Sequence, residues 1–147
     1  MRFKKIANAL LILTVSTNLG TTNVQARENG TKTFDWRPLM DAITQVESEG
    51  NVRAVSGKSC GAMQIKPILV EDCNAILKER GESRRFTLND RFSLKKSREM
   101  FIVYMSEYNP ENNVERAIRL WNGGVRYTVK GTQRYYNKVM KEYSARN

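Results

Sequence analysis

Apolar residues recur at helical spacing in five separate segments of this chain, and residues that stop helices lie between the segments. In the first segment, apolar side chains recur every three or four positions, at Trp36, Leu39, Met40, Ile43 and Val46. This is the spacing of one buried helix face. Strand-like alternation is nearly absent and is weak even around residues 52–55. We therefore expect a mainly α domain with about five helices and little or no strand.

Proline, glycine and capping residues predict where these helices begin and end. Asp35 is an N-cap type, and Pro38 fits the first turn of the first helix. Pro67 opens a second helix that ends near Gly81. The charged stretch 82–91 is predicted to be a surface connection. The remaining boundaries are Ser93 and Thr132 as N-caps, Asn109-Pro110 as a stop, and Asn122-Gly123-Gly124 as the sharp end of the fourth helix.

The first 26 residues have the pattern of a secretory signal peptide. Three basic residues come first, the apolar run Ile6–Val15 follows, and Val24-Gln25-Ala26 is a small-x-small cleavage site. The apolar run is shorter than the roughly 20 residues that span a bilayer, so a retained anchor is the less favoured alternative. We expect residues 27–34 to be a flexible lead-in to a single domain at 35–147, exported to the periplasm or cell envelope.

The chain is strongly basic. It has 25 Lys and Arg against 15 Asp and Glu, a net charge of +10. Without the signal peptide, 22 basic and 15 acidic residues leave +7. A basic surface attracts nucleic acid, anionic membrane or anionic wall polymer, although such charge also serves solubility alone. For an exported protein the cell wall is the more accessible partner. We expect no nucleic-acid partner, and no membrane partner after signal removal.

Several kinds of chemistry are excluded by composition. The chain has no histidine, which rules out Ser-His-Asp and Cys-His catalysis and His-based zinc sites. It contains no glycine-rich phosphate-binding motif, and we expect neither a cofactor nor a metal. Cys60 and Cys73 either form a disulfide, which export would permit, or remain buried thiols. Carboxylates, tyrosines and amides are the functional groups that remain.

Glu47 is the carboxylate with the most unusual predicted position. It lies one turn beyond Ile43, at the border of the apolar stripe of the first helix, whereas Glu49 lies nearly opposite. A glutamate at a helix end is more often a surface charge. Partial burial, however, raises a carboxyl pKa and allows proton donation near neutral pH. Cleavage of a glycosidic bond requires such a donor.

Short motifs around Glu47 occur in an order that resembles a known family. They are Glu47-Ser48, Ala54-Val55-Ser56, Gly61-Ala62-Met63-Gln64-Ile65, Trp121-Asn122-Gly123-Gly124 and Thr132-x-x-Tyr135-x-x-x-Val139. Together they resemble the soluble lytic transglycosylase domain, a branch of the lysozyme-like superfamily, over roughly residues 36–140. The resemblance implies an α+β lysozyme-like catalytic domain with its acid at the end of the first domain helix.

The resemblance also implies a role for each matching residue. Glu47 is expected to be the sole acid/base, and Ser48 to orient the substrate or Glu47. Gly61 and Gly124 are expected at tight turns. The other expected substrate-binding residues are Met63, Gln64, Asn122 and Tyr135. Met63 is equally well explained as core filler, and Asn122 is expected to contact sugar or to brace the site. The Tyr135 hydroxyl is expected to lie near Glu47.

The implied reaction is cleavage of the β-1,4 bond between N-acetylmuramic acid and N-acetylglucosamine in peptidoglycan. Ordinary glycosidases need a second carboxylate at about 5 Å or about 6.5–9.5 Å, and the sequence gives no convincing candidate. A single-acid scheme is therefore favoured, and the resemblance implies that it yields 1,6-anhydromuramic ends. The alternatives are a hydrolytic lysozyme-type muramidase and a non-catalytic basic wall-binding protein. We expect a monomer that acts on glycan strands, alone or beside a secretion or conjugation apparatus.

Overall fold

The computed structural model describes residues 33–146, and this part of the chain is mainly helical, as predicted. The predicted signal peptide and most of the lead-in lie outside the described residues. The described elements are α1 (Arg37–Ser48), β1 (Val55–Ser56), β2 (Ser59–Cys60), α2 (Pro67–Glu79), the 3-10 helix η1 (Leu88–Phe92), α3 (Leu94–Tyr108), α4 (Val114–Gly123) and α5 (Val129–Ser144).

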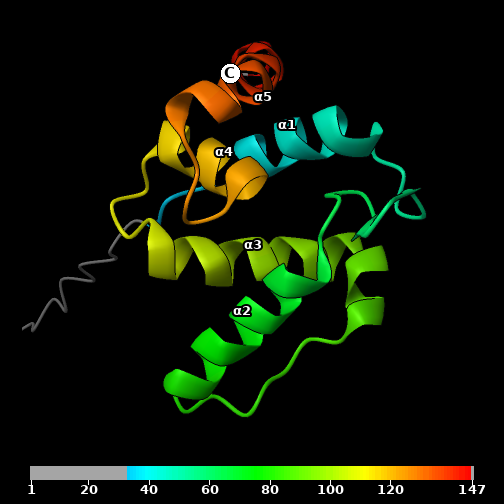
Figure 1. The fold of residues 1–147 in the computed structure, drawn as a ribbon, viewed down its shortest axis with the longest axis vertical. Helices are drawn as coiled ribbons and strands as arrows, with labels where there is room; N and C mark the ends of the chain where they lie inside the picture. The colour runs from blue at the N-terminus through cyan, green and yellow to red at the C-terminus, as the bar shows by residue number, and fades with distance from the viewer. Residues whose placement is uncertain (1–32, 147) are drawn as a thin grey trace, which may run out of the picture. The chain divides into compact units, whose positions relative to one another are not determined.

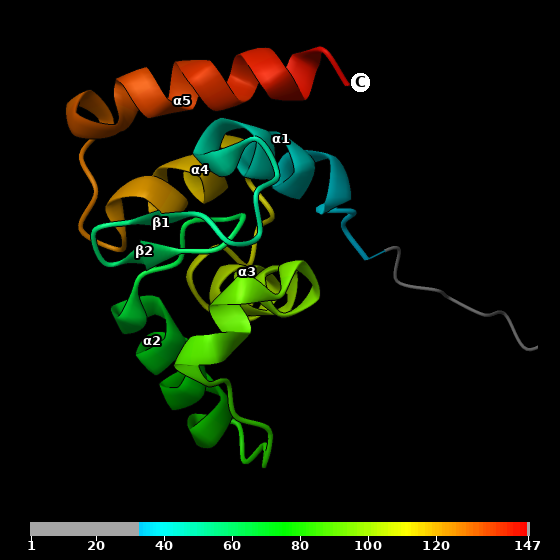
Figure 2. The same cartoon turned by 90° about the vertical axis from the view of Figure 1, so that its right-hand side faces the viewer.

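The helices pack around α3. In Figures 1 and 2, α2 lies on one side of α3, and α1 and α4 lie on the other, with α5 covering α1 and α4 as an outer layer. Phe101 of α3 is fully buried at the centre, and its ring packs against Trp36 and Trp121, with centroids 5.5 and 5.2 Å away. The two short antiparallel strands form a hairpin beside this core, with Val55 opposite Cys60.

Most of the predicted helix ends are confirmed. Pro67 is in the first turn of α2, and the Ser93 hydroxyl caps α3 by accepting a hydrogen bond from the Lys96 amide. The predicted cap of α5 is wrong by one turn. Thr128 is the N-cap, and Thr132 is buried inside the helix, where its hydroxyl donates to the Thr128 carbonyl at 2.8 Å. The helix therefore includes Gly131 in its first turn.

A buried arginine joins α5 to α4. The Arg119 side chain is 3% exposed, and its guanidinium donates to Glu115 on α4 and to the Val129 carbonyl, the Thr132 hydroxyl and the Gln133 side chain of α5, at 2.8–3.0 Å. Its charge is thus almost fully hydrogen-bonded, which is the condition for burying an ion without a large penalty. These contacts fix the rotation of α5 relative to α4.

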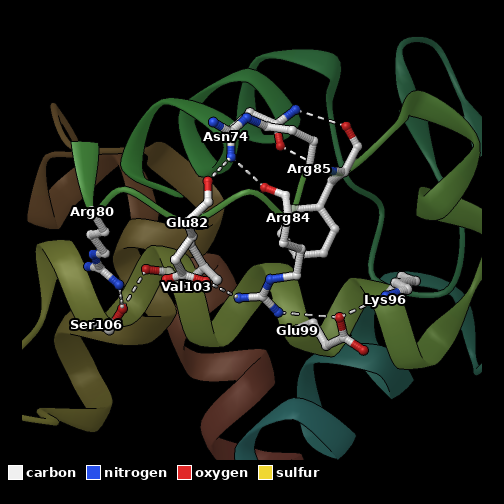
Figure 3. A network of polar contacts seen from close by, with 10 residues as sticks. Asn74, Arg80, Glu82, Arg84, Arg85, Lys96, Glu99, Val103 and Ser106 are labelled. Atoms are coloured by element: carbon white, nitrogen blue, oxygen red, sulfur yellow. Dashed lines mark hydrogen bonds and ion pairs between the residues drawn. The ribbon is translucent and has the colours of Figure 1, made fainter. Parts of the chain in front are cut away.

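The predicted surface connection at 82–91 is only partly at the surface. Figure 3 shows Arg84 of this segment near Glu99 of α3, with which it forms an ion pair at 3.5 Å. Phe86, in contrast, is buried, and its backbone amide and carbonyl exchange hydrogen bonds with the Asn74 side chain at 2.7 and 2.8 Å. Within residues 33–146, no helix is long and apolar enough to cross a membrane.

Candidate active site

Glu47 lies on the last turn of α1, where the helix ends and the chain turns into the hairpin. Its side chain is half-buried. Two residues later, Glu49 closes the helix in a left-handed conformation (φ 54°) and is exposed to solvent, as predicted. The helix geometry therefore separates the two glutamates into different environments, and only Glu47 lines a cleft.

A short hydrogen bond connects Glu47 to α5. The Tyr135 hydroxyl donates to Glu47 Oε1 at 2.7 Å. The structure thus places this hydroxyl where the resemblance implied. The neighbouring Tyr136 turns away, and its ring contacts the Arg119 guanidinium, 4.5 Å from the ring centroid. Because Arg119 fastens α5 to α4, it also helps to hold Tyr135 over the end of α1.

Burial sets the protonation of this pair. Desolvation raises the pKa of Glu47 above its ordinary value, while the hydrogen bond from Tyr135 and the positive charge of Lys66 offset part of the rise. Desolvation and the nearby Glu47 charge raise the pKa of Tyr135 far above that of a free phenol. Tyr135 therefore stays a hydrogen-bond donor, and Glu47 retains its proton to higher pH than an exposed carboxyl.

A cleft of about 640 Å³ opens beside Glu47. It lies between the hairpin, the start of α2 and the end of α4, and a volume in this range suits a small-molecule or oligomer subsite. The lining residues are Ser56, Ser59, Gln64 and Ile65 from the hairpin region, Lys66, Ile68, Leu69 and Asp72 from α2 and its start, Tyr104 from α3, and residues 120–126 from α4 and the turn after it.

Two amide side chains predicted to bind substrate line this cleft. Gln64 has a left-handed backbone (φ 51°), and its Nε2 donates to the carbonyls of Gly61 at 2.9 Å and Ala54 at 3.4 Å. Its Oε1 makes no hydrogen bond among the described residues, so it is free to accept one. Asn122, at the end of α4, is exposed in the cleft wall. Both side chains can therefore hydrogen-bond hydroxyl or acetamido groups.

Gly61 is required by a close approach of two backbones. It has a φ of +78°, and a Cβ placed there would lie 1.7 Å from the carbonyl oxygen of Arg91. The buried Arg91 guanidinium in turn donates to the carbonyls of Lys58 and Ile65 at 3.1 and 3.3 Å. Arg91 was predicted to be at the surface, and it instead braces the hairpin that carries Gln64. Gly124 also has a positive φ of 68°, which permits the turn after α4.

Three predicted substrate-binding residues are not part of the cleft lining: Ser48, Met63 and Tyr135, whose hydroxyl instead contacts Glu47. Met63 is fully buried in the core cluster and is not part of the groove wall. Its backbone carbonyl accepts a hydrogen bond from the Trp121 indole N–H at 3.3 Å. The Ser48 hydroxyl donates to the Ala62 carbonyl at 2.8 Å. Its hydrogen bond is therefore not made to Glu47, and Ser48 does not line the cleft. Ser48 and Met63 instead fix the loop that carries Gln64.

Cys60 and Cys73 are both buried free thiols, so the disulfide alternative is not what the structure shows. The Cys73 thiol lies in the core and donates to the Met100 carbonyl at 3.4 Å. Burial raises its pKa to about 12, which leaves it protonated and unreactive at neutral pH.

Three charged cleft residues were not found from the sequence: Lys66, Asp72 and Arg126. Asp72 is the other carboxylate that lines the cleft, and burial together with nearby Glu71 raises its pKa. It shares one face of α2 with Ile68, one turn earlier. No local signal distinguishes it, because its place depends on how α2 packs beside the hairpin.

Comparisons of this chain with protein-family models, curated proteins and solved structures found no match. Among residues 33–146, no group of three or more cysteine, aspartate or glutamate side chains is arranged to hold a metal ion. The chemistry of the site is therefore inferred from its own side chains.

Tyr135→Phe tests the electrostatics of the pair. Because the hydrogen bond from Tyr135 lowers the pKa of Glu47, its removal should raise that pKa further. A carbon-13 NMR titration of the Glu47 carboxyl measures the shift. Tyr136→Phe is the matched control, since Tyr136 contacts Arg119 and not Glu47, and should leave the titration unchanged. An unchanged or lower pKa in Tyr135→Phe would contradict the assignment of this hydrogen bond.

Proposed function

We propose that this chain is an exported peptidoglycan-cleaving enzyme that acts on the β-1,4 bond between N-acetylmuramic acid and N-acetylglucosamine. The observation that supports this best is a half-buried glutamate with a raised pKa, held by a 2.7 Å hydrogen bond from Tyr135 at the wall of a cleft. A protonated carboxyl beside an open groove is the group that glycosidic cleavage needs. The ordered motifs that resemble lytic transglycosylases favour this bond.

In the proposed reaction, Glu47 acts first as an acid and then as a base. The protonated carboxyl donates to the bridging oxygen as the bond to the muramic anomeric carbon breaks. The substrate's own acetamido oxygen stabilises the positive anomeric carbon. The Glu47 carboxylate then takes the proton of the muramic C6 hydroxyl, whose oxygen bonds to the anomeric carbon. Glu47 is protonated again, no water is consumed, and the product ends in a 1,6-anhydro ring.

The neighbouring side chains suit these two roles. Tyr135 keeps its proton, so it can hold the Glu47 carboxyl in one orientation in both protonation states. Lys66 stabilises the carboxylate that forms after proton donation. The free Oε1 of the half-buried Gln64 and the exposed amide of Asn122 match the hydroxyl and acetamido groups of the sugar rings.

Hydrolysis is the second candidate, and one observation favours it. Asp72 lines the same cleft as Glu47, and a second carboxylate can activate or position a water molecule in a hydrolytic glycosidase. In that case water would intercept the anomeric centre and leave a reducing end. The Asp72→Asn variant separates the two schemes, because anhydro-ring formation by Glu47 alone does not need Asp72.

Product mass analysis tests the proposal directly. Purified glycan strands are digested in water enriched in oxygen-18, and the fragments are weighed. We expect anhydro products with no incorporated label, for wild type and for Asp72→Asn. Products heavier by one labelled water, lost in Asp72→Asn, would establish hydrolysis instead. Retention on insoluble peptidoglycan with no soluble fragments would indicate the non-catalytic binding protein.

A further inference from the structure

The positive charge of the described chain is concentrated at its C-terminal end. Residues 33–146 contain 20 Lys and Arg and 14 Asp and Glu, a net charge of +6. Residues 126–146 alone contain six basic residues and one acidic residue, Glu142, a net of +5. Residues 33–125 are therefore nearly neutral, with 14 basic and 13 acidic residues. The basic character belongs to α5 and its flanks.

Four of these cations form one face of α5. Lys130, Arg134, Lys138 and Lys141 are spaced four, four and three residues apart, which places them within about 80° around the helix and along about 16 Å of its length. All four are exposed. Figures 1 and 2 show α5 as an outer layer, with α1 and α4 beneath it. We call these four residues the basic face.

No acidic side chain within residues 33–146 forms an ion pair with the basic face. The ion pairs within residues 33–146 use other cations, and Figure 3 shows two of them, Arg84 and Lys96, beside Glu99. None of the four basic-face side chains has a hydrogen bond or an ion pair in the described structure. Like charges one helical turn apart destabilise a helix by a few tenths of a kcal/mol per pair. The basic face therefore has no evident role in stabilising the fold.

The basic face begins four residues after a cation of the cleft wall. Arg126 lines the cleft, and it lies two residues before Thr128, the N-cap of α5. Along the sequence, a cation of the cleft wall therefore precedes the first residue of the basic face, Lys130.

Within the arc of the four cations, α5 presents no large apolar or aromatic side chain, and Gln133 and Asn137 flank the arc on one side. The exposed Val125 and Val129 lie outside the arc. The absence of large apolar or aromatic groups within the arc disfavours insertion of this face into a bilayer and stacking on nucleic-acid bases.

We propose that the basic face holds the anionic polymer of the cell wall outside the cleft. This inference rests on the proposed function, since it assigns a second contact to the same substrate. The groups recognised are the carboxylates of the peptide chains carried by the glycan. Their attraction to exposed cations is electrostatic and sensitive to salt. The contact keeps the enzyme on an insoluble substrate while the cleft binds and releases successive segments of the glycan strand.

The test compares two fourfold variants in the Glu47→Gln background, so that the polymer is bound without being cut. One variant changes Lys130, Arg134, Lys138 and Lys141 to Gln. The matched control changes four ion-paired cations elsewhere, Arg37, Arg80, Arg84 and Lys96, to Gln. Both lose the same charge, and circular dichroism verifies their folding. Binding to purified insoluble peptidoglycan is measured by co-sedimentation at about 0.01 M salt, where the Debye length is about 30 Å, and at about 0.5 M salt, where it is roughly 4 Å.

We expect about tenfold weaker sedimentation for the basic-face variant at low salt and less than about twofold for the control, with the difference lost at high salt. With Glu47 intact, the basic-face variant should cleave short soluble fragments at the normal rate, which separates this inference from the proposed function. Equal binding by the two variants would overturn it. So would a loss confined to phosphatidylglycerol vesicles or duplex DNA, with wall binding unchanged.

Discussion

Glu47→Gln is expected to abolish cleavage of peptidoglycan, with a loss of roughly a thousandfold in rate, the usual size of a general acid/base contribution. Glutamine keeps the shape of the side chain, and its oxygen can still accept the hydrogen bond from Tyr135. It cannot donate a proton to the leaving oxygen or take one from the muramic C6 hydroxyl. Both proposed steps therefore fail together.

The loss is measured as release of soluble fragments from labelled peptidoglycan. Glu49→Gln is the matched control, because Glu49 is two residues away, exposed and outside the cleft. It removes the same charge and should retain nearly full activity. Normal release of fragments by Glu47→Gln would show that Glu47 is not the acid.

The pH dependence of the melting temperature of Glu47→Gln is a second, independent test. Burial raises the folded-state pKa of Glu47, so the stability that the protonated form contributes is full below the unfolded pKa of about 4.3 and is lost as pH rises through the folded pKa. Gln does not titrate. The melting temperature of Glu47→Gln should therefore rise relative to wild type between pH 4 and pH 7. A constant difference over that range would mean that Glu47 is not desolvated.

Gly61→Ala is expected to have the largest effect on folding, a loss of about 3 kcal/mol or more in the free energy of unfolding. The added Cβ would lie 1.7 Å from the Arg91 carbonyl oxygen, and the residue would keep a φ of +78°. Neither the hairpin nor η1 can move easily, because the Arg91 side chain also bonds the carbonyls of Lys58 and Ile65. The Gln64 side of the cleft should be displaced as well.

Gly57→Ala provides the control in the same hairpin. Gly57 also has a positive φ, +58°, but a Cβ there meets nothing within 4 Å. Only the backbone conformation then costs energy, roughly 1–2 kcal/mol. Urea unfolding of both variants measures the difference. Equal destabilisation would show that the close approach to Arg91 is absent or readily relieved.

The sequence by itself determined the features that depend on local physics. The helical spacing of apolar residues predicted the mainly α fold, and Pro67 and Ser93 predicted helix starts, because capping and periodicity act within a few residues. The half-buried position of Glu47 followed from the stripe of α1 alone. The exposure of Glu49 followed in the same way.

Other features were decided by contacts between distant segments, which no local pattern encodes. The sequence left open whether Met63 lines the groove or fills the core, and tertiary packing places it in the core while Gln64 lines the cleft. Arginine usually lies at the protein surface. Arg91 and Arg119 are buried because carbonyls and side chains of other elements accept hydrogen bonds from their guanidinium groups. Only the folded chain brings Tyr135 within 2.7 Å of Glu47, 88 positions earlier, since hydrogen bonding and desolvation depend on distance in space.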